Sequence, residues 1–151
     1  MTAVRVASPA DAATVAELLH AFNAEFDTSS PGAEALAERL RRLLAGDGMV
    51  ALLAGEPAAG VALLSFRPNV WDEGPVALLD ELYVRPQLRG RGLGTELLHR
   101  AFAVARERGV ETFEVNVDEG DVDARRFYER HGVALTGPDQ EERALYYFRR
   151  L

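Results

Sequence analysis

The segment Val84-Arg85-Pro86-Gln87-Leu88-Arg89-Gly90-Arg91-Gly92-Leu93-Gly94-Thr95 decides how this chain folds. Apolar residues 76–84 precede it, and an amphipathic run that ends at Gly109 follows it. This succession predicts a strand, a glycine-rich turn and then a helix. Such a turn gathers backbone N–H groups at the positive end of the helix dipole, where anions bind. We interpret it as a cradle for the pyrophosphate of a nucleotide-like cofactor.

Composition limits the class of protein. The 151 residues are 48% hydrophobic and 27% charged, which is typical of a globular protein, so we expect one domain over residues 1–151. No apolar run approaches the roughly 20 residues that span a bilayer, and the first residues lack the apolar core of a signal peptide. The absence of cysteine excludes disulfides and thiolate sites. We expect a cytoplasmic protein that does not act at a membrane.

The charge of the chain points away from nucleic acid. A net charge of −7 disfavours binding to phosphates, which call for a basic face. It mildly favours cationic small substrates, although acidic proteins are also simply more soluble. The three histidines, His20, His99 and His131, fall on separate elements without ligand-like spacing, so we expect no metal site.

The spacing of apolar and turn-forming residues predicts a mixed α/β sheet with helices on its faces, in the order β-α-α-β-β-β-α-β-α-β-β. Gly55-Glu56-Pro57 should form the turn of a hairpin, and residues 76–84, which are apolar on both faces, should form a central strand. The expected strands are 4–6, 49–54, 60–66, 76–84, 112–117, 133–136 and 144–148, and the expected helices are 9–25, 33–44, 93–108 and 121–130.

Three nucleotide-binding templates compete for the glycine turn. A P-loop ends in Lys-Ser or Lys-Thr, and this turn has no lysine. A dinucleotide fingerprint needs Gly-x-Gly-x-x-Gly, whereas Gly90, Gly92 and Gly94 alternate with single residues. The third template fits: Gln87-x-x-Gly90-x-Gly92, or Arg89-x-x-Gly92-x-Gly94 in the overlapping register, resembles the acetyl-CoA signature of the GNAT superfamily of N-acetyltransferases.

Two flanking motifs extend this resemblance. Leu82-Tyr83-Val84-x-Pro86 looks like the fourth strand of that family, and Ala124-x-x-Phe127-Tyr128-Glu129-x-x-Gly132 looks like its second signature. One position departs from the pattern, because Asp121 stands where the family commonly has asparagine. A carboxylate cannot donate a hydrogen bond as an amide does, so Asp121 could serve only as a helix N-cap. We consider Asn116, in the preceding expected strand, as the residue that would make this polar contact to the cofactor instead.

The resemblance implies that acetyl-CoA is the cofactor. Main-chain atoms of Leu82 and Val84 would pair with its pantetheine arm, and backbone donors at residues 89–95 would hold its pyrophosphate. The side chains of Arg89 and Arg91 can add charge-assisted hydrogen bonds to phosphates. The full set of expected cofactor-binding residues is Leu82, Tyr83, Val84, Gln87, Arg89, Gly90, Arg91, Gly92, Leu93, Gly94, Thr95, Asn116, Asp121, Ala124 and Phe127.

Acetyl transfer from a thioester to an amine needs a base for the amine and an acid for the leaving thiolate. The resemblance assigns the acid to Tyr128. For the base we favour Asp80, with Glu81 in reserve as a base or as a recognition group for a cationic substrate. Strand alternation should send Asp80 and Glu81 to opposite faces. The alternative for each carboxylate is a buried ion pair with an arginine.

The resemblance therefore predicts an acetyl-CoA-dependent N-acetyltransferase that acts on the primary amine of a small, cationic molecule by direct transfer in a ternary complex. Phe22, Phe26, Asp27 and Trp71 are the expected walls of the acceptor site. Two alternatives stay open: a protein or peptide N-acetyltransferase, and a non-catalytic acyl-CoA-binding module. The resemblance also implies a homodimer.

Overall fold

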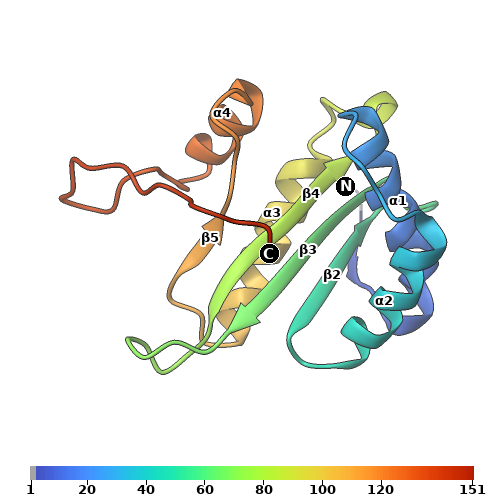
Figure 1. Ribbon diagram of the computed structural model, residues 1–151, viewed down its shortest axis with the longest axis horizontal. Coiled ribbons are helices and arrows are strands. Elements are labelled where there is room, and N and C mark those ends of the chain that lie inside the picture. Colours follow the sequence, from blue (N-terminus) through green and yellow to red (C-terminus); the bar gives the residue numbers. More distant parts are fainter. Residues whose placement is uncertain (1–2) are drawn as a thin grey trace. The chain divides into compact units, whose positions relative to one another are not determined.

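The strands of this chain form a five-stranded sheet in the order β1-β2-β3-β4-β5 (Figure 1). The structure is a computed structural model that describes residues 3–151. Its strands are β1 (Val4–Val6), β2 (Met49–Ala54), β3 (Gly60–Arg67), β4 (Val76–Val84) and β5 (Phe113–Val115). Neighbouring strands from β1 to β4 pair antiparallel, and Ala77 N–H donates to Thr112 O at 3.1 Å, which brings the start of β5 beside β4. The chain divides into two compact units, one ending at Phe113 and the other beginning at Glu114.

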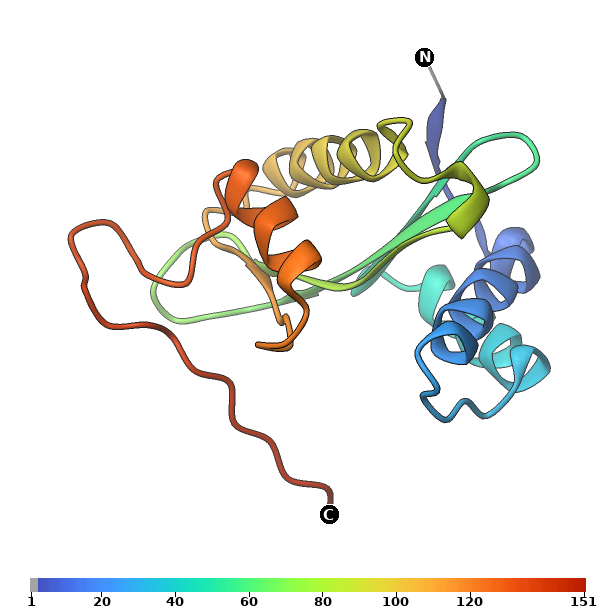
Figure 2. The same ribbon diagram turned by 90° about the horizontal axis from the view of Figure 1, so that it is seen from above.

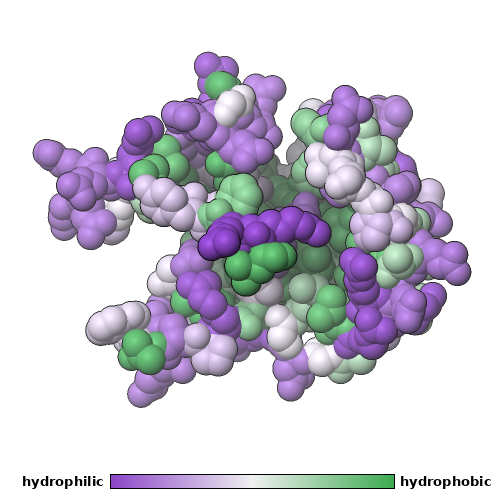
Figure 3. Space-filling model, in the orientation of Figure 1, coloured by the Kyte–Doolittle hydropathy of each residue, from purple (hydrophilic) through white to green (hydrophobic). Residues whose placement is uncertain are grey.

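Helices cover both faces of the sheet in the first unit. Helices α1 (Ala12–Glu25) and α2 (Ala33–Ala45) lie on one face, and α3 (Leu93–Glu107) lies on the other (Figure 2). Short 3-10 turns precede α1 and α3, at Pro9–Asp11 and Pro86–Leu88. The outward surfaces of α1 and α2, at the right of Figure 3, are mostly hydrophilic.

Leucine and valine side chains fill the space between these layers. Leu18 of α1, Leu53 of β2 and Val61 of β3 are fully or almost fully buried in one cluster on the α1 and α2 side. Leu97 and Leu98 are fully buried on α3. The predictions made from apolar spacing are confirmed for α1, α2 and α3, for the hairpin of β2 and β3, and for the long strand β4. No helix among residues 3–151 is long and apolar enough to cross a membrane.

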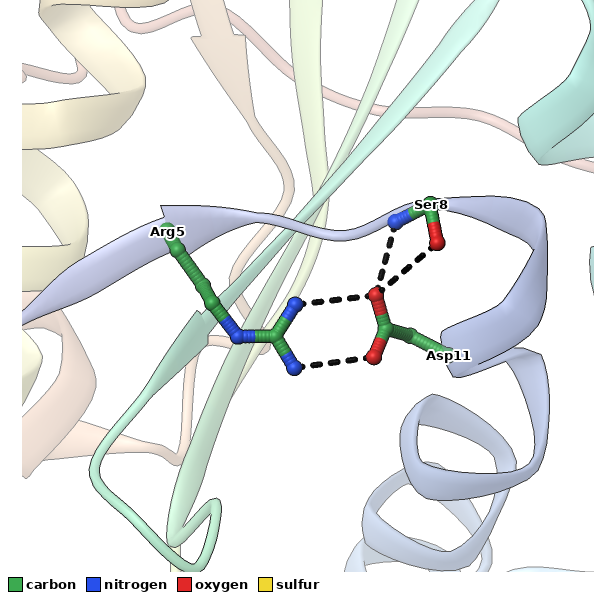
Figure 4. Close-up of polar contacts among 3 residues, drawn as sticks. All are labelled: Arg5, Ser8 and Asp11. Atoms are coloured by element: carbon green, nitrogen blue, oxygen red, sulfur yellow. Dashed lines mark hydrogen bonds and ion pairs between the residues drawn. The ribbon is translucent and has the colours of Figure 1, made fainter.

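A compact polar cluster fixes the passage from β1 into α1 (Figure 4). The Arg5 guanidinium donates to both oxygens of Asp11, at 2.9 and 2.8 Å, and Ser8 N–H donates to the same carboxylate at 2.8 Å. The bonds from Arg5 and then Ser8 hold the pKa of Asp11 well below its usual range. The chain contains no lysine, so arginines and histidines are its only basic side chains.

The second unit holds one helix, α4 (Val122–Arg130). Asp121 caps it, since its carboxylate accepts from Ala124 N–H at 3.0 Å, which confirms the N-cap reading. The strands predicted at 133–136 and 144–148 are wrong, because residues 134–151 form neither helix nor strand. A two-stranded ribbon is marginal without a third strand, and here Ala144 N–H to Leu135 O, 2.8 Å, is the backbone bond that joins the two segments. The prediction of a strand over 112–117 was too long by one residue at its start and two at its end.

Replacing Asp11 by asparagine should lower the free energy of unfolding by about 0.5–1 kcal/mol at pH 7, because an amide makes weaker bonds to Arg5. Asp11 has a lowered pKa in the folded state, so its contribution is complete above its unfolded pKa of about 4 and is lost as the pH falls toward the folded value. Urea unfolding of both proteins between pH 3.5 and 7 should therefore show a difference that shrinks on acidification. A difference independent of pH would contradict this account.

Candidate functional site

The glycine turn presents unbonded backbone donors to solvent. Gly90 and Gly92 have φ angles of +75° and +83°, in the left-handed region that favours glycine. A Cβ added to either would meet no atom within 4 Å, so the turn is open and a ligand can approach its backbone. The first helical bond of α3 runs from Glu96 N–H to Gly92 O, 3.0 Å. Among residues 3–151, no backbone or side-chain acceptor bonds to the N–H groups of residues 90–95, so these donors remain for an anion at the start of α3.

The Arg89 side chain has partners within the protein. Its guanidinium makes two bonds to the Glu25 carboxylate, at 2.9 and 2.8 Å, and its Nε donates to Val84 O at 2.9 Å. The side chain that was expected to reach toward phosphates thus ties the end of β4 and the turn to the end of α1. The groups left at the turn for an anion are therefore the backbone N–H groups and the exposed Arg91.

One edge of β4 is available to a strand-like ligand near the turn. Arg85 N–H donates to Ala59 O at 2.8 Å, so the main-chain groups of Arg85 face β3. Alternation turns the main-chain groups of Leu82 and Val84 to the opposite edge. β5 has three residues against nine in β4, and it begins beside Ala77, so it cannot cover that edge as far as Val84. The main-chain groups of Leu82 and the Val84 N–H therefore face an uncovered edge, whereas Val84 O already accepts from Arg89 Nε.

An aromatic cluster joins the end of α1 to the end of β4. The Tyr83 ring is 4% exposed and stacks on Phe22 with centroids 5.1 Å apart, and Phe26 meets Phe22 edge-on at 5.4 Å. The Tyr83 hydroxyl donates to Glu25, and burial followed by the charge of Glu25 raises the pKa of Tyr83. The structure therefore brings Phe22 and Phe26 together with Arg89 of the glycine turn. Asp27, which has φ of +51°, is the second residue after α1.

Trp71 lies away from the aromatic cluster at the end of α1. It is 89% exposed in the loop of residues 68–75, which precedes β4, whereas Tyr83 is near the end of that strand. At about 3.3 Å per strand residue, this separates Trp71 from the Phe22 cluster by roughly 20 Å or more. A pocket of about 400 Å³ lies beside the same loop, and none of the predicted site residues lines it. Its lining residues are Asp47, Gly48, Phe66, Pro68, Asn69, Glu73, Gly74, Pro75 and Arg108.

The structure corrects the expected placement of Asp80 and Glu81. In the β3–β4 ladder Leu63 pairs with Glu81 and Leu64 pairs with Leu79, so Asp80 is an extra, bulged residue. Glu81 shares the face of Leu63, its cross-strand partner. Asp80 forms a side-chain hydrogen bond with Ser65, two residues along β3 and therefore on that same face. The prediction of opposite faces was wrong, because the bulge interrupts the alternation.

The pKa values of both carboxyl groups are raised, which favours their neutral form. Burial raises the pKa of Asp80, and the bond to Ser65 partly opposes this rise. Burial and then the charge of Asp80 raise the pKa of Glu81. Leu63 and Tyr83 belong to the hydrophobic cluster beneath α1, so Glu81 lies on the face that carries Phe22. Paired carboxyls with raised pKa values are suited to accepting a proton from a bound ligand.

Sequence reasoning missed two contributors to this site. Ser65 was detectable only as a polar interruption of an apolar strand. Glu25 gave no signal at all, because a glutamate at the end of a helix is usually solvated.

The remaining predicted residues belong to the second unit. Tyr128 on α4 is 8% exposed, and its ring lies edge-on to Phe127 at 5.2 Å. Phe127 O accepts a hydrogen bond from the His131 ring at 2.8 Å. Ala124 donates its N–H to Asp121, as described above, and Asn116 is exposed just after β5.

Comparison with known proteins identifies the family of this chain. Residues 14–133 match the model of the acetyltransferase (GNAT) family. An uncharacterised N-acetyltransferase from Archaeoglobus fulgidus is 35% identical over 80 residues, which cover 53% of this chain and 54% of the relative, so the match spans about half the length of each. Thialysine N-epsilon-acetyltransferase from Caenorhabditis elegans is 29% identical over 125 residues, covering 81% of this chain and 76% of that protein.

A solved structure extends the similarity over the full chain. A protein from Arthrobacter sp. FB24, described as a candidate acetyltransferase, superimposes with a TM-score of 0.94 and 56% sequence identity. The match covers 100% of this chain and 97% of that one.

A double-mutant cycle should measure the link between α1 and the turn. We expect Glu25→Gln and Arg89→Met to show a coupling of about 0.5–1 kcal/mol in the free energy of unfolding, since both side chains are partly exposed and screened by water. Urea unfolding of the wild type, both single variants and the double variant gives this value. Strictly additive effects would show that the pair contributes nothing.

Proposed function

The chain belongs to the acetyltransferase (GNAT) family, and from this premise we propose that it moves the acetyl group of acetyl-CoA to the primary amine of a small cationic molecule. The observation that carries the proposal is the succession along β4: raised-pKa carboxyls at the bulge, a main-chain edge at Leu82 and Val84 that no strand of this chain pairs with, and then an open turn with unbonded N–H groups. A donor that runs along that edge would bring its far end toward the carboxyls.

The residues present fit acetyl-CoA. N–H groups of residues 90–95 would hold the pyrophosphate, and main-chain groups of Leu82 with the Val84 N–H would pair with the pantetheine amides. When bound, acetyl-CoA supplies a thioester carbonyl that an amine can attack. The family match runs from residue 14 to residue 133 and so crosses from one unit into the other, which supports residues 1–151 acting as a single acetyltransferase domain.

Glu81 is our choice for the base. An amine arrives as an ammonium ion and must lose a proton before it can attack. The Glu81 carboxylate takes this proton, directly or through water, on the face that also carries Phe22. Asp80 helps by raising the pKa of Glu81, while Ser65 holds Asp80 in place. The Tyr128 hydroxyl supplies a proton to the leaving thiolate.

The acceptor is proposed to enter beside the end of α1. Phe22 and Phe26 offer aromatic surface, and Glu81, Asp80 and Asp27 offer negative charge, which suits a cation with an apolar body. The relative from Caenorhabditis elegans is named for acetylating thialysine, a small molecule with a primary amine. Trp71 is left out of this acceptor site because of its distance from Phe22.

Turnover with a panel of amines, followed by release of free thiol, tests the activity and the role of Tyr128. Tyr128→Phe should lower kcat about 10²-fold or more while acetyl-CoA still raises the melting temperature. Tyr146→Phe, which removes a hydroxyl from an exposed tyrosine, should leave kcat unchanged. Stabilisation by acetyl-CoA without turnover of any amine would favour a non-catalytic acyl-CoA-binding module instead.

The pH profile tests the base. A base with a raised pKa is active when deprotonated, so kcat/KM should fall as the pH drops through a value above the ordinary glutamate range. Glu81→Gln should abolish this acid limb and lower kcat/KM about 10²-fold or more. Asp80→Asn should keep the limb but move it to lower pH, because a neighbouring negative charge is gone. If Asp80→Asn removes the limb and Glu81→Gln does not, their roles are reversed.

A further inference from the structure

The backbone is loosely held at two places, the end of α1 and the glycine turn. At the end of α1, Phe26 N–H donates to Phe22 O at 3.3 Å and Asp27 N–H donates to Ala24 O at 3.4 Å, which is longer than most backbone hydrogen bonds. At the turn, a Cβ added to either glycine with a left-handed φ would meet no atom within 4 Å. Segments of this kind open more readily than the core, so a contact between them affects the order of both.

Glu25 makes the contact that joins these two segments. It is the last residue of α1, and its carboxylate accepts two hydrogen bonds from the Arg89 guanidinium and a third from the Tyr83 hydroxyl. The same guanidinium lies 5.6 Å from the centroid of the Tyr83 ring. Because Tyr83 stacks on Phe22, one carboxylate connects the turn that would hold the donor to the aromatic wall of the proposed acceptor site.

A carboxylate is an unexpected neighbour for a turn that binds an anion. By charge alone, Glu25 repels a phosphate at the N–H groups of residues 90–95 and neutralises the guanidinium of Arg89. Its side chain is 27% exposed and that of Arg89 is 43% exposed, so water screens the pair and its contribution to stability is small. The forked contact does supply direction. Its two parallel bonds, together with the bond from Arg89 Nε to Val84 O, fix the residue after which the open N–H groups begin.

We propose that Glu25 is a positioning residue that couples the glycine turn to the end of α1. CoA held by the turn orders the end of α1 through Arg89 and Glu25, and an acceptor against Phe22 and Phe26 strengthens the hold of the turn on CoA. The coupling is reciprocal, because each ligand changes the affinity for the other by the same factor. It rests on the proposed function, since CoA is taken as the occupant of the turn.

Calorimetric titration with CoA alone distinguishes positioning from charge by the sign of the effect. Glu25→Gln removes a negative charge beside the anion site and keeps the shape of the side chain, so electrostatics alone would tighten CoA binding. Loss of positioning instead raises the Kd for CoA about fivefold or more. The KM for acetyl-CoA should rise by a similar factor while kcat stays within about twofold, because Glu25 acts through Arg89 and not on the reacting atoms.

Hydrogen exchange measures the coupling away from the bound CoA. In the wild type, CoA should slow exchange of the Phe26 and Asp27 amides about fivefold, and Glu25→Gln should lose this effect. Arg89→Lys keeps the positive charge but not the forked bonds, so it should behave like Glu25→Gln, and it provides the test if that variant fails to fold. Glu17→Gln is the matched control, because it removes an exposed carboxylate from the same helix, and it should behave like the wild type.

The outcomes separate this coupling from the acetyl transfer on which it rests. Tighter CoA binding by Glu25→Gln, or an equal slowing of exchange in that variant and the wild type, overturns the coupling and leaves acetyl transfer standing. An Arg89→Lys variant that binds CoA like the wild type means that charge alone matters, which also overturns the coupling. A wild-type chain that does not bind CoA overturns both proposals.

Discussion

One extra residue in β4 determines what faces the candidate site. Before the bulge at Asp80, Leu79 pairs with Leu64, and after it Glu81 pairs with Leu63. The shift reverses the alternation of every later residue in the strand. As a result Tyr83 packs under α1, Glu81 shares its face, and the main-chain groups of Leu82 and Val84 turn to the open edge. Without the bulge, Tyr83 would point toward α3, and the carboxyls would lie apart.

A second constraint, the Arg89 side chain, fixes the glycine turn relative to the end of α1. Arg89 binds Val84 O and Glu25 together, and Glu25 also accepts from Tyr83. One guanidinium thus connects the end of α1, the last residues of β4 and the turn that offers its N–H groups. The contact between the proposed donor and acceptor regions is polar and directional, so it defines relative position better than apolar packing alone would.

Local periodicity accounts for what the sequence could predict. Apolar residues at helical spacing located α1, α2 and α3, and the glycine turn followed from its own composition. The bulge at Asp80 could not be foreseen, because it is visible only in the pairing with β3. The same holds for Ser65 and Glu25, whose roles arise from contacts with residues distant in sequence. Residues 144–148 have a strand-like pattern, but a strand needs a partner that the pattern does not supply.

The ion pairs described above have one more chemical property. Arg5 with Asp11 and Arg89 with Glu25 both use a guanidinium, and the chain contains no lysine at all. A guanidinium remains protonated at physiological pH and is a poor nucleophile, whereas a lysine amine reacts with thioesters. An acetyl-transferring enzyme of this family handles an activated acetyl donor. Its structural cations are therefore resistant to acetylation by the donor that it handles.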